Sequence, residues 1–159
     1  MFQPALVSFY KAVLFGIATI LLIPKEKYKK FLIYGFLLGA VGDVLIVTLV
    51  GGLLGLIKYQ NTGPFNILGL FSFWTPLAWM FTLMLFLYFL PVRIVFYHVY
   101  IVGFALFGFM VGLVLQHLGT FQYVGNYIYF APITFITWFF LSAWLYRRSE
   151  NIALLNKIK

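Results

Sequence analysis

The chain has no cysteine and very few acidic residues. Its 159 residues include 3 Asp and Glu against 11 Lys and Arg, and charged residues of either sign make up only 9%. The missing thiols exclude a disulfide framework, a thiolate metal site and a cysteine nucleophile. So few carboxylates provide neither a metal-ligand cluster nor an acid pair for catalysis. We therefore expect no catalytic residue, no metal site and no cofactor.

Apolar and aromatic side chains dominate instead. Hydrophobic residues make up 64% of the chain and aromatic residues 22%, with a mean hydropathy of +1.04. Soluble domains are about 45 to 50% apolar and about 25% charged. One small core cannot bury this much apolar surface, so lipid must solvate most of it. The net charge of +8 does not indicate nucleic acid as a partner, because the basic residues lie in short segments between apolar runs.

Five segments are long and apolar enough to cross a bilayer, which takes about 20 residues of helix for a hydrocarbon core of about 30 Å. We predict an all-α polytopic bundle in one domain, with spans at about 4–23, 31–57, 74–90, 94–118 and 127–146. The apolar stretch 64–73 is too short to cross. It is expected to be interfacial or re-entrant, and residues 147–159 to be a cytoplasmic tail.

The basic residues predict the orientation. With the N-terminus outside, all but two of the 11 Lys and Arg residues face the cytoplasm; Lys58 is in an outer loop and Lys11 is inside a span. Lys and Arg accumulate in cytoplasmic loops, so we predict an N-out, C-in topology. The lipid bilayer is then the first partner. The side chains expected to contact anionic headgroups at the cytoplasmic face are Lys25, Lys27, Lys29, Lys30, Arg93, Arg147 and Arg148.

Two charged residues, Lys11 and Asp43, lie deep in predicted spans, and intramembrane ionisable residues are functional hypotheses. Each is about 18 Å from the cytoplasmic end of its span, at about 1.5 Å of rise per residue. A tight hairpin between the first two spans would place both side chains at the same depth. In the first interpretation, they then form a structural ion pair. Alternatively, Lys11 extends toward the interface and leaves Asp43 hydrogen-bonded or protonated. In a third interpretation, the two residues form a proton-linked or substrate-linked site.

Other residues at similar depth could complete such a site. Trp79, Thr134 and Thr137 are candidate pocket-lining residues, although aromatic residues are so frequent in this chain that core packing is the first explanation for them. Gly35 and Gly39 share a helical face with Asp43, where small residues let a neighbouring helix approach closely.

Several short motifs carry a resemblance to a bacterial family. They are Gly42-Asp43, Pro64-Phe65-Asn66-Ile67-Leu68-Gly69, Trp74-Thr75-Pro76-Leu77-Ala78-Trp79 and Leu87-Tyr88-Phe89-Leu90-Pro91. Together they resemble small, uncharacterised multi-pass membrane proteins of spore-forming Firmicutes. The resemblance covers roughly the second and third predicted spans. It implies a bacterial plasma membrane and implies nothing about a substrate.

The first functional expectation is a non-enzymatic structural or partner-binding membrane component, because catalytic groups are so few. Its partner would be a second copy of the chain or another membrane protein. The alternative is a small proton-linked or solute-linked transporter centred on Asp43 and Lys11. A lipid-active enzyme is disfavoured, since such chemistry needs more acid, base or metal groups than the sequence offers.

Overall fold

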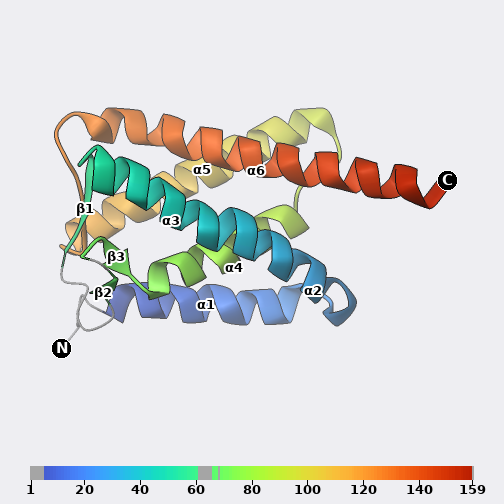
Figure 1. Ribbon diagram of the computed structural model, residues 1–159, viewed down its shortest axis with the longest axis horizontal. Helices are drawn as coiled ribbons and strands as arrows, with labels where there is room; N and C mark the ends of the chain where they lie inside the picture. The colour runs from blue at the N-terminus through green and yellow to red at the C-terminus, as the bar shows by residue number, and fades with distance from the viewer. Residues whose placement is uncertain (1–5, 61–65, 68, 159) are drawn as a thin grey trace.

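The computed structural model describes residues 6–60, 66–67 and 69–158, and for residues 152–158 it describes the backbone alone. It is a bundle of helices that run alternately in opposite directions (Figure 1). The predicted all-α class is confirmed. The helical elements are α1 (Val7–Leu22), α2 (Lys25–Tyr34), η2 (Gly35–Val41), α3 (Gly42–Ile46), η3 (Val47–Leu53), α4 (Trp74–Tyr88), α5 (Ile94–His117) and α6 (Tyr127–Ile158).

Elements α2, η2, α3 and η3 follow one another without a break, and we call this continuous helix, Lys25–Leu53, the second helix. The segments η2 and η3 are π-helical, so their backbone turns are wider than those of an α-helix. The basic segment 25–30, which lies between the first two predicted spans, is helical from Lys25 onward. Only Ile23 and Pro24 separate it from α1, because proline cannot continue the preceding helix.

Among the residues that the structure describes, three helices are long and apolar enough to cross a membrane. They are the second helix, α5 and the part of α6 from Tyr127 to Asn151, with mean hydropathies of 2.2, 2.2 and 1.6. The helices α1 and α4 are apolar but shorter, with 16 and 15 residues. The segment expected as a tail continues α6 to Ile158, and Figure 1 shows this end of α6 projecting beyond the other helices.

Short strands close one end of the bundle. Strand β1 (Ile57–Tyr59) pairs antiparallel with β4 (Phe121–Tyr123), and β2 (Asn66–Ile67) pairs with β3 (Phe71–Ser72). Figure 1 shows them at the end where α1 begins. The described part of 64–73 is therefore a small hairpin that leads into α4. Its position at the membrane interface stays a prediction.

A glycine turn directs β4 into the bundle. Gly119 follows the end of α5 with φ of 70°, a left-handed conformation that glycine adopts without strain. The amides of Gly119 and Thr120 bond back to the carbonyls of Gln116 and Leu115 and so close the helix. The chain reverses there, and Tyr123 points inward.

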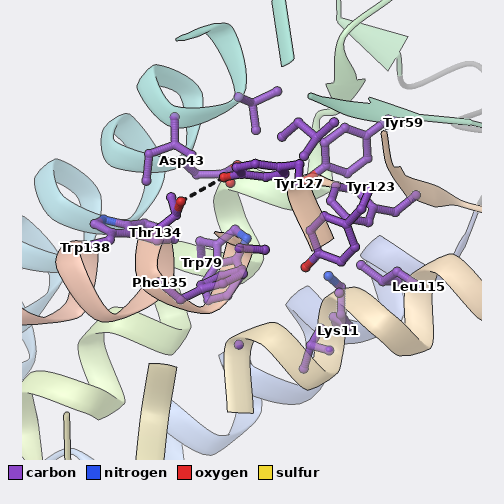
Figure 2. A pocket seen from close by; sticks show the side chains of 18 residues that line it. Lys11, Asp43, Tyr59, Trp79, Leu115, Tyr123, Tyr127, Thr134, Phe135 and Trp138 are labelled. Carbon is purple, nitrogen blue, oxygen red and sulfur yellow. Dashed lines mark hydrogen bonds between the residues drawn. The ribbon is translucent and has the colours of Figure 1, made fainter. Parts of the chain in front are cut away.

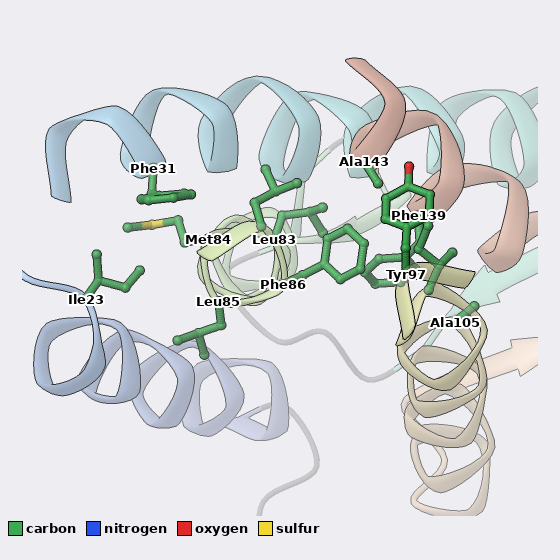
Figure 3. Close-up of a cluster of buried hydrophobic side chains, with 12 residues drawn as sticks. Ile23, Phe31, Leu83, Met84, Leu85, Phe86, Tyr97, Ala105, Phe139 and Ala143 are labelled. Atoms are coloured by element: carbon green, nitrogen blue, oxygen red, sulfur yellow. The ribbon is translucent and has the colours of Figure 1, made fainter. Parts of the chain in front are cut away.

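The buried centre of the bundle is α4. It packs against α1 on one side and against the second helix on the other (Figures 1 and 3). Leu83, Met84 and Phe86 are fully buried in the larger hydrophobic core. The sequence had suggested that α1 and the second helix form a hairpin in direct contact, but α4 lies between them.

Close approach of α4 to the second helix depends on glycine. A β-carbon at Gly39 would lie 2.6 Å from the carbonyl oxygen of Trp79 and 2.7 Å from the Cα of Met80, which is closer than such atoms pack. A β-carbon at Gly35 would lie 2.7 Å from the carbonyl oxygen of Met80. The expectation that these glycines admit a neighbouring helix is confirmed, and that helix is α4.

We expect Gly39→Ala to destabilise the protein by about 1 to 3 kcal/mol, since the added methyl meets backbone that cannot move aside. The matched control is Gly103→Ala in α5, where a β-carbon has nothing within 4 Å. Alanine favours helix over glycine, so the control should be neutral or stabilising. Thermal unfolding of both variants in detergent measures the difference. Equal melting temperatures would contradict close packing at Gly39.

Candidate functional site

A small cavity lies between the helices, next to the β1 and β4 strands. It has a volume of about 60 Å³, and its wall comes from α1, the second helix, α4, α5, α6 and both strands (Figure 2). Most of the wall is apolar or aromatic. The polar side chains that reach it are Lys11, Asp43, Tyr59, Tyr123, Tyr127 and Thr134.

Asp43 is the most deeply buried charged residue in the wall. It lies in the short α3 segment, which the π-helical turns of η2 and η3 flank on both sides. Its side chain is 3% exposed, and its Oδ2 atom has no hydrogen-bond partner. A buried polar atom without a partner is energetically unfavourable, so it marks a place where water, a proton or a ligand would bind.

The ion pair expected between Lys11 and Asp43 is not formed. Within the described part of the chain, the one ion pair closer than 4.0 Å joins Lys30 and Glu150. The physical reason is α4, which separates α1 from the second helix. Lys11 and Asp43 nevertheless line the same cavity, Lys11 from α1 and Asp43 from the second helix. Figure 2 shows them on opposite sides of it.

Hydroxyl groups complete the polar lining. The Tyr127 and Thr134 hydroxyls share a hydrogen bond of 2.8 Å. The Tyr123 hydroxyl is buried and has no partner. It occupies the space that Gly112 leaves open, because a β-carbon there would collide with it. Burial raises the pKa of Tyr123 and of Tyr59, so both phenols keep their protons at neutral pH and can donate hydrogen bonds.

Of the three residues expected to line a pocket, two line this cavity. Trp79 comes from α4 and Thr134 from α6. Thr137, one helical turn from Thr134, instead lines an open apolar groove of about 560 Å³ between the second helix and α6. Ile46, Thr134 and Trp138 contribute to both. They form the partition between the cavity and the groove.

Trp138 is fixed in this partition. Its indole N–H donates a 3.0 Å hydrogen bond to the carbonyl of Leu38, within the π-helical segment η2. A β-carbon at Gly42 would lie 2.9 Å from the same indole nitrogen, so glycine lets the ring lie against the second helix.

The sequence did not identify the tyrosines of the strands. Tyr59 and Tyr123 reach the cavity only because β1 pairs with β4, with Tyr123 opposite Ile57. No short sequence pattern around either tyrosine predicts this pairing of strands. Gly108 and Gly112, a small-residue pair in α5, face the cavity, where they give room to Phe135, Trp79 and Tyr123.

No metal site is formed: within residues 6–60, 66–67 and 69–158 no three His, Asp or Glu side chains come together. The ring of His98 bonds the carbonyl of Ile94 in its own helix at 2.9 Å.

The basic residues lie mainly at the end of the bundle opposite the strands (Figure 1). Two of them have hydrogen-bond or ion-pair partners among the described residues, and the Arg148 guanidinium lies 5.2 Å from the ring centre of Trp144. Lys30 pairs with Glu150 at 2.5 Å, which ties the second helix to α6. Arg147 donates hydrogen bonds to the carbonyls of Pro91 and Val92, and its guanidinium lies 3.8 Å from the ring centre of Tyr97. Lipid contact stays a prediction for all of the basic side chains expected to make it: Lys25, Lys27, Lys29, Lys30, Arg93, Arg147 and Arg148.

Comparison with family models, with curated proteins and with solved structures gave no match for this chain. The resemblance to multi-pass proteins of spore-forming Firmicutes therefore stays a prediction.

We expect Trp138→Phe to destabilise the protein by about 1 to 3 kcal/mol, because the ring stays apolar but the Leu38 carbonyl loses its indole donor. The matched control is Trp144→Phe, since Trp144 is 44% exposed and lies on the outer surface of α6. Chemical or thermal unfolding in detergent compares the two. An equally large loss of stability in Trp144→Phe would mean that the size of the ring, and not the hydrogen bond, determines the effect.

Proposed function

We propose that the chain crosses the plasma membrane of a bacterial cell five times, with its N-terminus outside. In the described part of the chain, five helices of alternating direction support this proposal, as do the basic turns gathered at one end (Figure 1). The outward faces are also apolar, with Leu21, Val95 and Ile133 each at least 60% exposed. Such surfaces suit lipid and do not suit water. The short helices α1 and α4 would cross a locally thinned or narrower part of the bilayer.

Cysteine labelling tests this topology without background, because the chain has no cysteine. Gln60→Cys, beside β1, should react with a membrane-impermeant maleimide from outside the cell. Arg93→Cys, in the exposed turn between α4 and α5, should react only after the membrane is opened. The reverse labelling pattern would mean that the chain has the opposite orientation in the membrane. Labelling of both sites from the same side would mean that α4 does not cross the membrane, and it would contradict five spans.

We further propose that the protein is a small proton-linked or solute-linked carrier built around the cavity between Asp43 and Lys11. The observation that carries this proposal is the unpartnered Asp43 oxygen, buried at the wall of a mostly apolar cavity inside an apolar bundle. An ionised group at mid-membrane is unfavourable by about 2.5 to 3.5 kcal/mol on insertion scales. A protein that keeps such a group without an ion-pair partner gains a site that takes up and releases a proton.

The size of the cavity restricts what it holds in this conformation. An apolar cavity of about 150 Å³ accommodates benzene, whereas a water molecule needs at least about 10 to 15 Å³. At about 60 Å³, this cavity has room for a few water molecules or for a very small solute. Transport of anything larger would require the helices to separate.

A partner-binding role is the second candidate, and the groove between the second helix and α6 favours it. The groove is open, apolar and about 560 Å³ in volume, with walls that include Leu37, Leu45 and Leu141. A helix of a second copy or of another membrane protein could pack there. The ion pair that would have made Asp43 and Lys11 purely structural is absent from the described residues, so the carrier proposal stands first.

Proton flux into proteoliposomes tests the carrier proposal. With a pH gradient imposed across the membrane and a pH-sensitive dye inside, the wild-type chain should dissipate the gradient faster than empty vesicles. Asp43→Asn should lower the protein-dependent rate at least tenfold, because the amide cannot bind and release the proton.

The control for this experiment is Glu26→Gln, which makes the same chemical change at an exposed carboxylate outside the cavity. It should keep the wild-type rate. Wild-type rates from Asp43→Asn, in a preparation that is folded, would favour the structural role instead.

A further inference from the structure

The cavity has two chemically different sides. Figure 2 shows Asp43, Tyr127 and Thr134 together on one side, and Lys11 on the other, with the Tyr123 hydroxyl directed toward it. On the first side, the Tyr127 and Thr134 hydroxyls already bond each other. On the second side, the Lys11 ammonium has no hydrogen bond or ion pair with any described residue, and the Tyr123 hydroxyl has no partner.

We infer that the side with Lys11 and Tyr123 binds a small monovalent anion, and that the anion is bound together with a proton on Asp43. This inference rests on the proposed carrier function and names the class of its substrate: a small acid, taken up as anion and proton. The proton leaves solvent and forms an O–H bond with an Asp43 oxygen, while the anion exchanges its hydration for the ammonium and phenol donors.

The donors at this side fit an anion. Lys11 supplies three N–H groups and a positive charge, and Tyr123 supplies an O–H group that burial keeps protonated. Charge-assisted hydrogen bonds of this type are about twice as strong as neutral ones. Tyr123 is 6% exposed and rests in the space beside Gly112, so its hydroxyl is held in place before any ligand arrives.

Charge balance links the anion to the proton. With Asp43 ionised and Lys11 protonated, the empty cavity is neutral overall. An anion alone would leave a net negative charge in a medium that solvates ions poorly, and this is strongly unfavourable. If Asp43 takes a proton as the anion binds, the cavity stays neutral. The two ligands should therefore bind cooperatively, as linkage requires.

Volume restricts the anion further. About 60 Å³ is less than half of the approximately 150 Å³ that holds a benzene ring. Formate fits this size, and benzoate does not. The ring side chains of Trp79, Phe135 and Trp138 limit expansion, because they pack against one another.

Thermal-shift titration of the full chain in detergent tests the inference, with sodium formate as the probe and sodium benzoate as the size control at constant ionic strength. Formate should stabilise the protein, and benzoate should not. The apparent Kd for formate should rise about tenfold for each pH unit above the point where Asp43 ionises, because one proton accompanies each anion. The titratable groups that face Asp43 are Lys11 from α1, Tyr59 from β1, Tyr123 from β4 and Tyr127 from α6. The α4 and α5 residues in the wall do not titrate.

Variants distinguish binding of the anion from binding of the proton. Asp43→Asn should bind formate with a Kd that no longer depends on pH, since the amide is neutral like the protonated acid. Tyr123→Phe should raise the Kd for formate at least fivefold, and Lys11→Met should abolish the stabilisation by formate. Because Lys11→Met could fail to fold, Tyr123→Phe gives an independent readout. Its control is Tyr129→Phe on the exposed surface of α6, which should bind as the wild type does.

Three results would overturn the inference: equal stabilisation by formate and benzoate, a Kd for formate that does not change with pH in the wild type, or wild-type affinity for formate in Tyr123→Phe. Stabilisation by sodium itself that grows as the pH rises would instead assign a cation to Asp43. Failure here is distinguishable from failure of the carrier proposal. If formate does not bind but Asp43→Asn still abolishes proton flux, the protein carries protons and the anion site does not exist.

Discussion

The close packing of α4 against the second helix is the contact on which the rest of the structure depends. Gly35 and Gly39 remove the side chains that would hold the two backbones apart, so α4 enters the bundle between α1 and the second helix. The short α4 is then buried along most of its length, with Leu83 and Phe86 at the centre of the core. In a membrane, where lipid competes equally for apolar side chains, association of this kind relies on close packing.

Insertion of α4 also determines the electrostatics of the interior. It lies between α1 and the second helix, and Lys11 and Asp43 form no ion pair within the described residues. The aromatic rings of α4 and α6 then surround a space that neither charge fills. The charges can attract each other across the cavity, but each still has unmet hydrogen-bonding capacity. A bundle that was only structural would gain stability by pairing them or replacing them with apolar residues.

The π-helical segments of the second helix lie on either side of this site. An α-helix would hold Asp43 in a regular backbone, whereas η2 and η3 shift the register of the helix before and after it. The Leu38 carbonyl in η2 accepts the indole N–H of Trp138, and this ring forms the partition between the cavity and the lateral groove. The same irregular helix thus positions the carboxylate and the wall beside it. π-Helical turns occur frequently at functional sites, in agreement with this arrangement.

The sequence by itself determined the properties that follow from composition: a helical protein whose apolar segments suit lipid, with basic residues in short segments between them and with Lys11 and Asp43 inside apolar segments. These follow from local patterns, since helix length and hydropathy depend on neighbours in the chain. Only the tertiary structure decided which helices touch. The insertion of α4, the pairing of β1 with β4 that brings Tyr59 and Tyr123 inward, and the separation of Thr137 from Thr134 all depend on contacts between distant segments. Apolar residues are distributed almost evenly around the axes of α4, α5 and α6. The sequence periodicity therefore does not indicate which face of a helix packs against which neighbour.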